Sequence, residues 1–150
     1  MSRSSLQDQY FPDLPCFGCG PANERGLRLK SFDDGDLVVA EFEPWPEHDN
    51  GLGYLNGGII ATVLDCHSAA VVTHEAFTRG WPPLPGAALP YVTAGLDLQY
   101  LRPAPLDETV RLVGRILTAS EPEISSEVWL EWGGKQRARA TAVWKRWRPR

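Results

Sequence analysis

Apolar residues form one long run in the middle of the chain, between residues 59 and 73. No Pro or Gly interrupts this run, and apolar side chains fall on nearly every side of a helical projection. That pattern predicts a helix buried all round rather than one lying on a surface. One side differs, because small or polar residues recur there at steps of three and four: Ala61, Thr62, Asp65, Ser68 and Ala69.

Shorter alternating segments flank the helix and predict strands. Two precede it, at residues 27–32 and 37–42, and we expect the turn at 33–36 to join them as a hairpin. The dense Gly and Pro residues of 77–90 predict a crossing loop or lid. Four strands follow, separated by Pro-containing breaks and a Gly-Gly turn: 91–100, 109–119, 124–132 and 136–147. This order indicates an α+β fold, with an antiparallel sheet packed on one buried helix.

The length and composition suit one domain with a substantial core, since the chain has 150 residues and is 43% hydrophobic. A net charge of −4 and the lack of an extended basic run argue against a nucleic-acid partner. The apolar run is too short to cross a bilayer, and the first ten residues lack the apolar core of a signal peptide. We therefore expect a polar lead at 1–15, a single domain at 16–150, no membrane partner and a cytoplasmic location.

The three cysteines, Cys16, Cys19 and Cys66, are an odd number and give no disulfide framework, which suits a reducing cytoplasm. Cys16 and Cys19 form a Cys-x-x-Cys motif, a weak metal signal because a closed zinc site needs four ligands. His48 and Cys66 would complete such a site only if folding happened to bring them there. We therefore expect packed thiols in a structural Gly/Pro-rich loop, and no metal, in preference to a metal or redox site.

Two glycines, Gly57 and Gly58, open the predicted helix. Glycine lets another group approach the backbone closely, and the first amides of a helix have no partner within it. At the positive end of the helix dipole, these amides suit an anion or a polarised carbonyl oxygen. Asp65 follows Gly58 by seven residues, about two turns, and lies on roughly the same side. The pair suits acyl transfer; the alternative is a tight turn and a solvated or backbone-bonded Asp65.

Asn56-Gly57-Gly58 followed by Asp65 resembles the hotdog-fold acyl-CoA thioesterases of the phenylacetyl-CoA thioesterase (PaaI-like) family, within the 4-hydroxybenzoyl-CoA thioesterase superfamily. Residues 91–103, and Cys-Phe-Gly-Cys-Gly at 16–20, extend the resemblance over nearly the whole chain. The resemblance implies a hotdog fold, in which an antiparallel sheet of about five to six strands wraps around one long central helix. It also implies a homodimer, or a dimer of dimers, with active sites at the dimer interface.

The resemblance further implies a role for each matching residue. Asp65 would be the catalytic carboxylate, either as nucleophile or as general base, and the N–H of Gly58 would polarise the thioester carbonyl. Gly57, beside it, would contribute to substrate binding. Thr93 would help to position the attacking water, facing Asp65 of the other protomer. Asn56 stands where the family most often has His. Because an amide donates and accepts but cannot shuttle a proton, we expect Asn56 to orient the substrate.

The other candidate residues have structural alternatives. His48 lies in the loop before the helix and would either contribute to substrate binding or order that loop. Arg102, with basic residues near the C-terminus, would meet the phosphates of coenzyme A, unless these residues form a solvated face. His67 points away from Asp65 and suits the core or a dimer contact, while His74 suits a structural role at the helix end.

These features together predict a thioesterase that hydrolyses an acyl-CoA, or a related acyl thioester, to free acid and thiol without a cofactor. The alternative is a non-catalytic acyl-CoA- or lipid-binding hotdog protein in which Asn56 has lowered turnover. A hotdog dehydratase or hydratase would need a His with an acidic partner in its own spacing, and the sequence has no such pair.

Overall fold

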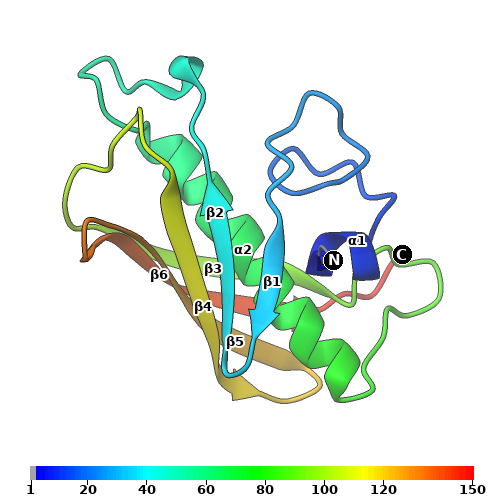
Figure 1. Cartoon of the computed structure of the whole chain (residues 1–150). Coiled ribbons are helices and arrows are strands. Elements are labelled where there is room, and N and C mark those ends of the chain that lie inside the picture. The colour runs from blue at the N-terminus through cyan, green and yellow to red at the C-terminus, as the bar shows by residue number, and fades with distance from the viewer. Residues whose placement is uncertain (1–2) are drawn as a thin grey trace.

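The computed structural model describes residues 3–150. One antiparallel sheet wraps around a long helix, α2 (Gly57–Thr78), as Figure 1 shows. The sheet has six strands in the order β1-β2-β4-β5-β6-β3. This is the predicted α+β hotdog fold. The strand bounds are Ser31–Asp34 (β1), Leu37–Phe42 (β2), Tyr91–Tyr100 (β3), Val110–Ala119 (β4), Glu123–Trp132 (β5) and Lys135–Arg146 (β6).

The strand predictions hold to within a residue except at β1. The predicted hairpin forms, but its turn is confined to Gly35 and Asp36, and Gly35 adopts a φ of 75°. Residues 27–30, predicted as strand, are irregular, because Arg28 has a φ of 51° that extended backbone does not allow. Their amides bond instead to the preceding loop, with Leu27 N donating to Phe17 O at 2.7 Å.

Helix α2 is longer at both ends than the predicted run of 59–73. Asn56 caps its start through its side chain. At its end, Gly80 has a φ of 77°, Gly80 N donates to Phe77 O, and Trp81 N donates to Ala76 O. These two bonds form a Schellman motif, which satisfies carbonyls that the last helical turn leaves open. The Gly/Pro-rich segment that follows is a loop, as predicted.

The helix is buried over most of its surface, as its apolar run predicts. Val63, Leu64, Ala70 and Val72 are fully buried against the concave side of the sheet. The sheet contributes small side chains opposite the helix, so that the two layers approach closely. These sheet residues include Ala138, Ala140 and Ala142 from β6, each at most 1% exposed.

The N-terminal segment, to which the sequence analysis assigned no element, contains a short helix, α1 (Leu6–Tyr10). Leu6 and Phe11 are buried in the main core. Gln7 is also fully buried, because its amide bonds to Ser31 through both the backbone N and the hydroxyl of that residue. The Ser31 hydroxyl lies 2.9 Å from His67 Nδ1, and His67 Nε2 lies 2.9 Å from Val38 O. One buried polar chain thus ties α1, β1, β2 and α2 together.

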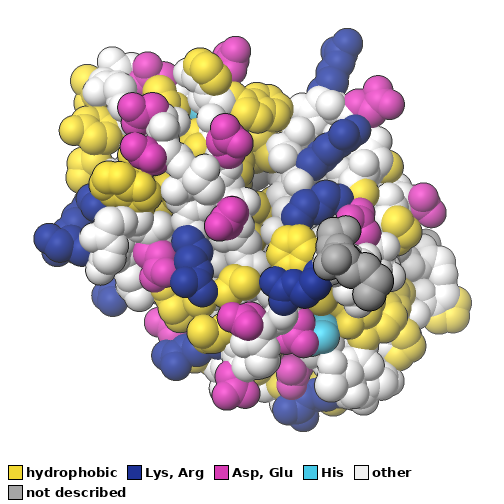
Figure 2. All heavy atoms as spheres, in the orientation of Figure 1, with side chains coloured by type: hydrophobic (Ala, Val, Ile, Leu, Met, Phe, Trp, Pro, Cys, Tyr) yellow, Lys and Arg dark blue, Asp and Glu magenta, His cyan; other side chains and the backbone are white. Residues whose placement is uncertain are grey.

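The sheet face in view in Figure 2 mixes acidic and basic side chains rather than separating them. Two cross-strand ion pairs join β4 to β5 at directly opposed positions, Arg111 with Glu131 and Arg115 with Glu127. Opposed unlike charges of this kind stabilise a strand pair modestly. Within residues 3–150, no helix has both the length and the apolar composition needed to span a membrane.

Candidate active site

Asp65 and Thr93 form the centre of the candidate site. Thr93 Oγ1 donates a 2.8 Å hydrogen bond to Asp65 Oδ1 within one chain. The expectation that Thr93 would face Asp65 of the other protomer is therefore wrong. The cause lies in the sheet, because β3 runs beside β6 and places Thr93 opposite Trp144, whose side chain is buried against α2.

A β-bulge in β3 aims Thr93 at the helix. The register between β3 and β6 shifts between Thr93 and Gly95, so that Ala94 has no partner in the ladder. Side chains alternate along a strand, and one inserted residue changes their phase. Thr93 before the bulge and Leu96 after it can thus both face α2, where they pair with Trp144 and Ala142.

The backbone around Asp65 is also braced. Trp144 Nε1 donates to Ser68 Oγ at 3.0 Å, and Ser68 Oγ donates to the carbonyl oxygen of Asp65 at 2.6 Å. The sequence analysis placed Ser68 on the same helix face as Asp65 but did not foresee the link to Trp144. Positions 68 and 144 are far apart in the sequence, so only the packing of β6 on α2 could reveal it.

Burial is the largest influence on the Asp65 carboxyl and raises its pKa. The hydrogen bond from Thr93 acts in the opposite direction, and the nearby Cys16 sulfur adds a smaller upward contribution. A half-buried carboxyl with a raised pKa and a single side-chain partner is a candidate for proton transfer at a functional site.

A cavity of about 420 Å³ opens beside this pair. Asp65 and Thr93 line it, together with a largely apolar wall. The wall comprises Phe11, Leu14, Pro15, Ala69, Leu89, Tyr91, Val92 and Trp144, and the three cysteines complete the lining. A concave, mostly apolar cavity with a few polar groups is the usual form of a small-molecule site.

The side chain of Asn56, the residue directly before α2, caps the start of the helix. Asn56 Oδ1 accepts hydrogen bonds from Gly58 N at 2.7 Å and from Ile59 N at 3.3 Å. The Gly58 amide, which the sequence analysis assigned to the thioester carbonyl, is thus already engaged. The Gly57 amide makes no hydrogen bond within residues 3–150. Tyr100 contacts the same turn, since its hydroxyl donates to Gly57 O at 2.7 Å.

The two halves of the predicted site do not meet within one chain. Gly57 and Asp65 are eight residues apart on one helix, about 12 Å along its axis. None of Asn56, Gly57 and Gly58 lines the cavity that contains Asp65. One thioester group is too small to contact both ends of this span directly.

His48 orders the loop before the helix. It is 5% exposed, and its ring lies against those of Phe42 and Trp45, with centroids 5.8 and 4.7 Å away. Trp45 N donates to His48 Nδ1 at 2.9 Å, and burial lowers the pKa of the ring. Of the two predicted roles, this geometry favours loop ordering. Arg102 is exposed, and its side chain makes no hydrogen bond or ion pair with residues 3–150.

The three cysteines come together beside Asp65. Their sulfur atoms all lie within 4.8 Å of one another, although the sequence offered Cys66 as a partner only by coincidence of folding. Hydrogen bonds from the Cys19 and Cys66 thiols lower the pKa of Cys16, and backbone amides add to the effect. Cys16 is therefore the thiol of the three that ionises most readily.

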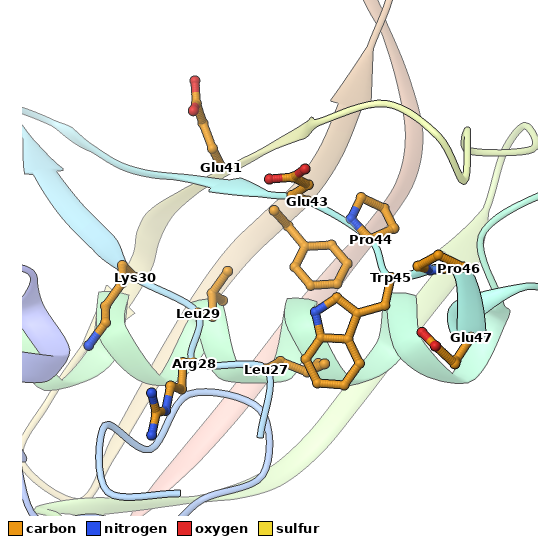
Figure 3. A pocket seen from close by; sticks show the side chains of 11 residues that line it. Leu27, Arg28, Leu29, Lys30, Glu41, Glu43, Pro44, Trp45, Pro46 and Glu47 are labelled. Atoms are coloured by element: carbon orange, nitrogen blue, oxygen red, sulfur yellow. The ribbon is translucent and has the colours of Figure 1, made fainter. Parts of the chain in front are cut away.

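A larger cavity, of about 580 Å³, lies elsewhere and contains none of the predicted site residues. Its lining comes from two segments, 27–30 and 41–47, as Figure 3 shows. Two basic side chains, Arg28 and Lys30, share it with Glu41, Glu43 and Glu47. This mixed lining lacks the paired carboxyl and hydroxyl of the cavity at Asp65, which we therefore take as the candidate active site.

The fold is shared with solved structures of other proteins. A phenylacetic acid degradation-related protein from Ralstonia eutropha is 21% identical, with a TM-score of 0.71 over 95% of this chain and 99% of that one. A Streptococcus mutans protein solved with acetyl-CoA is 20% identical, with a TM-score of 0.65 over 81% of this chain and 90% of that one. At these identities the likeness establishes the fold.

Sequence similarity gives the family. A thioesterase superfamily protein from Shewanella loihica is 31% identical over 80% of this chain and 91% of that one, with a TM-score of 0.62. The profile of the thioesterase superfamily matches residues 52–121, which include α2 and Thr93. Among proteins of curated function, none matches the chain by sequence. The chain is a hotdog-fold protein that belongs to the thioesterase superfamily.

Proposed function

We propose that this protein hydrolyses an acyl-CoA, or a closely related acyl thioester, to a free acid and a thiol, with Asp65 as the catalytic carboxylate. The observation that carries the proposal is the Asp65–Thr93 pair at an apolar cavity, in a chain of the thioesterase superfamily. The apolar wall suits an acyl group, and the carboxylate suits attack on a thioester or activation of water. The acetyl-CoA held by the Streptococcus mutans protein supports a coenzyme A ester as substrate.

We further propose that the active site is shared between two copies of the chain. Strand β3 is an edge of the sheet, with β6 on one side and no strand of residues 3–150 on the other. Its exposed apolar residues include Val92 and Tyr100, 41% and 56% exposed. A long edge strand with apolar side chains invites pairing with another strand.

Pairing of β3 with a second β3 about a two-fold axis would join the two halves of the site. Thr93, bonded to Asp65, lies near the start of β3, and Tyr100, bonded to Gly57, lies at its end. In an antiparallel pair, the start of one strand lies beside the end of the other. The Gly57 amide of one protomer would then approach Asp65 of its partner and serve as the donor to the thioester oxygen.

One observation favours the alternative, a non-catalytic acyl-CoA-binding protein. Asn56 engages the Gly58 amide that would otherwise be available to the thioester oxygen. With that donor occupied, stabilisation of the oxyanion would depend on the Gly57 amide alone. Binding of acyl-CoA without turnover would therefore be the expected behaviour if the Gly57 amide did not reach the substrate.

The test is thiol release from short, medium and aryl acyl-CoA substrates, by the native protein and by Asp65→Asn. We expect turnover to fall at least about 100-fold in Asp65→Asn, the lower end of the contribution of a general base. Asp36→Asn, which removes an exposed carboxylate in the β1–β2 turn, is the matched control and should retain full activity. Undiminished turnover in Asp65→Asn would refute the assignment, and binding of all substrates without turnover would establish the alternative.

A second experiment tests the shared site. Gly57→Pro removes the free amide, and Pro suits the first position of a helix when the preceding residue is extended, as Asn56 is. Gly57→Ala keeps the amide and is the matched control. Co-expression of Gly57→Pro with Asp65→Asn should restore roughly a quarter of native activity, since half of the dimers would be mixed and each would hold one intact site. No recovery would mean that the two groups act within one chain or not at all.

A further inference from the structure

The fold brings together three thiols that the proposed hydrolysis does not use. Cys16 and Cys19 come from the loop between α1 and β1, drawn in blue in Figure 1, and Cys66 comes from α2. The Cys16 and Cys66 sulfurs are 3.8 Å apart, and all three sulfurs lie within 4.8 Å of one another. All three are free, and both Cys19 and Cys66 are buried. The loop around Cys16 and Cys19 has specific features that bring the three thiols together.

Backbone hydrogen bonds hold the loop that carries Cys16 and Cys19. Gly20 N donates to Cys16 O at 2.8 Å and closes the turn that contains both thiols. Leu27 N donates to Phe17 O at 2.7 Å, and Leu29 N donates to Gly18 O at 3.0 Å, so residues 27–29 hold the turn from one side. The positions of Cys16 and Cys19 are therefore fixed by the backbone of the loop.

Two glycines allow the turn to form and to lie against the helix. A Cβ at Gly18 would lie 2.3 Å from the Cys66 sulfur, so any larger residue would push Cys66 away from the other two thiols. A Cβ at Gly20 would lie 2.3 Å from Cys16 N and 2.2 Å from Leu14 O. The close approach at Gly18 brings the Cys-x-x-Cys turn against α2, and the close approach at Gly20 lets the turn fold tightly on itself.

The spacing of the thiols fits a metal ion. Thiolates bound tetrahedrally to zinc at about 2.3 Å are about 3.8 Å apart, the separation found between Cys16 and Cys66. We propose that Cys16, Cys19 and Cys66 bind one Zn²⁺ ion, which ties the loop before β1 to helix α2. Each thiol gives up its proton when it binds the ion.

The fourth coordination position would face the candidate active-site cavity. No fourth His, Cys, Asp or Glu of residues 3–150 joins the three sulfurs. All three cysteines line the cavity that also contains Asp65 and Thr93. A zinc site with three protein ligands keeps its remaining position for water or another small ligand. The ion would thereby brace one wall of the cavity, next in sequence to Asp65.

The first test uses the unmodified protein, reduced and freed of metal. Addition of Zn²⁺ should give one bound ion per chain after gel filtration, and the three thiols should become protected from a thiol reagent. Co²⁺ in its place should produce sulfur-to-metal charge-transfer absorption, which packed thiols alone would not. Failure of the reduced protein to retain Zn²⁺ or Co²⁺ would overturn the proposal, as would binding that leaves all three thiols reactive.

A second test distinguishes residues that bind Zn²⁺ from residues outside the thiol cluster. Cys19→Ser should weaken Zn²⁺ binding by more than the about 10–100-fold that loss of an outer-shell partner costs. His48→Gln, which removes a potential ligand outside the cluster, is the control and should retain Zn²⁺. Zn²⁺ should raise the Tm of the control but not that of Cys19→Ser, since only a native state that binds the ion is stabilised by it. Equal binding by the two variants would overturn the proposal, and no readout depends on turnover.

Discussion

Helix α2 carries a carboxyl and an imidazole, Asp65 and His67, that are only two residues apart and face opposite halves of the sheet. His67 is completely buried and lies between Ser31 of β1 and Val38 of β2. Asp65 is half-buried, has Thr93 as its single side-chain partner, and lines a cavity. The same helix therefore holds one polar group that is fully satisfied within the fold and one that is not.

Both ring nitrogens of His67 are hydrogen-bonded. Because Val38 O can only accept, Nε2 carries the proton, and Nδ1 accepts from the Ser31 hydroxyl. Burial lowers the pKa of the ring to about 4, so His67 is neutral at pH 7. This confirms the core placement that the sequence analysis considered for His67.

The contrast between His67 and Asp65 distinguishes a residue that supports folding from one that is suited to catalysis. A buried polar group with every partner in place stabilises one arrangement of the chain. A half-buried carboxyl that faces an apolar cavity with one partner costs stability, and such groups are common at the functional sites of proteins. We therefore expect substitutions at position 67 to act on stability and those at position 65 to act on turnover.

The largest effect on stability should come from His67→Ala. It removes the acceptor of the Ser31 hydroxyl and a donor to Val38 O, and it opens a cavity, so we expect the free energy of unfolding to fall by about 3–5 kcal/mol. The measurement is urea denaturation beside His74→Ala, which removes a half-exposed ring bonded to Tyr10 and should cost about 1 kcal/mol. Equal losses for the two variants would contradict the special role of the buried chain.

The second largest effect should be a dependence of the folding stability on pH that is caused by His67. The unfolded ring takes up a proton below its ordinary pKa of 6.5, whereas the folded ring does so only near pH 4. The stabilisation is therefore complete above pH 6.5 and is lost as the pH falls toward 4, by about 3 kcal/mol. Unfolding measured across this range should show the loss, and in His67→Ala the dependence should be flatter. An equally steep dependence in the variant would assign it to other groups.

Thr93→Val should have a smaller effect, and it should act on turnover. The hydroxyl that donates to Asp65 lowers the pKa of that carboxyl, so its removal raises the pKa further. If Asp65 acts ionised, the acid limb of the pH–rate profile should move to higher pH, and turnover at neutral pH should fall about tenfold.

The control for this variant is Thr141→Val on β6, where the side chain is exposed. Its pH–rate profile should match that of the native protein. A Thr93→Val profile that keeps its acid limb in place would remove Thr93 from the proposed mechanism.

The sequence predicted the fold well because its signals are local. The long apolar run predicted α2, and apolar segments between Pro- and Gly-containing breaks, with clear alternation in β6, predicted β2 to β6 to within a residue. The errors arose where contacts between distant segments override local pattern. Residues 27–30 alternate like a strand but bond to the cysteine loop, and the polar residue Gln7 is buried because Ser31 satisfies its amide.

The candidate site was predicted in part for the same reason. Asp65 was identifiable because a carboxylate in an apolar helix is costly and therefore conspicuous. Its partner Thr93 came from the resemblance to a family, and the assignment to opposite protomers was wrong within this fold. Gly57 and Gly58 were correctly placed at the start of α2. The hydrogen bond from the Gly58 amide to Asn56 Oδ1 could not be predicted, because it depends on the conformation of the Asn56 side chain.

The sequence by itself determined the elements from β2 to β6, their order and the carboxylate Asp65 in the helix, because hydrophobic period and turn residues act over a few positions. Only the tertiary structure decided which polar groups find partners. It paired His67 with β1 and β2, Asp65 with β3, and Cys66 with a motif some fifty residues earlier. Such pairings depend on the curvature of the sheet around α2 and on one bulge in β3, and a local sequence pattern predicts neither feature.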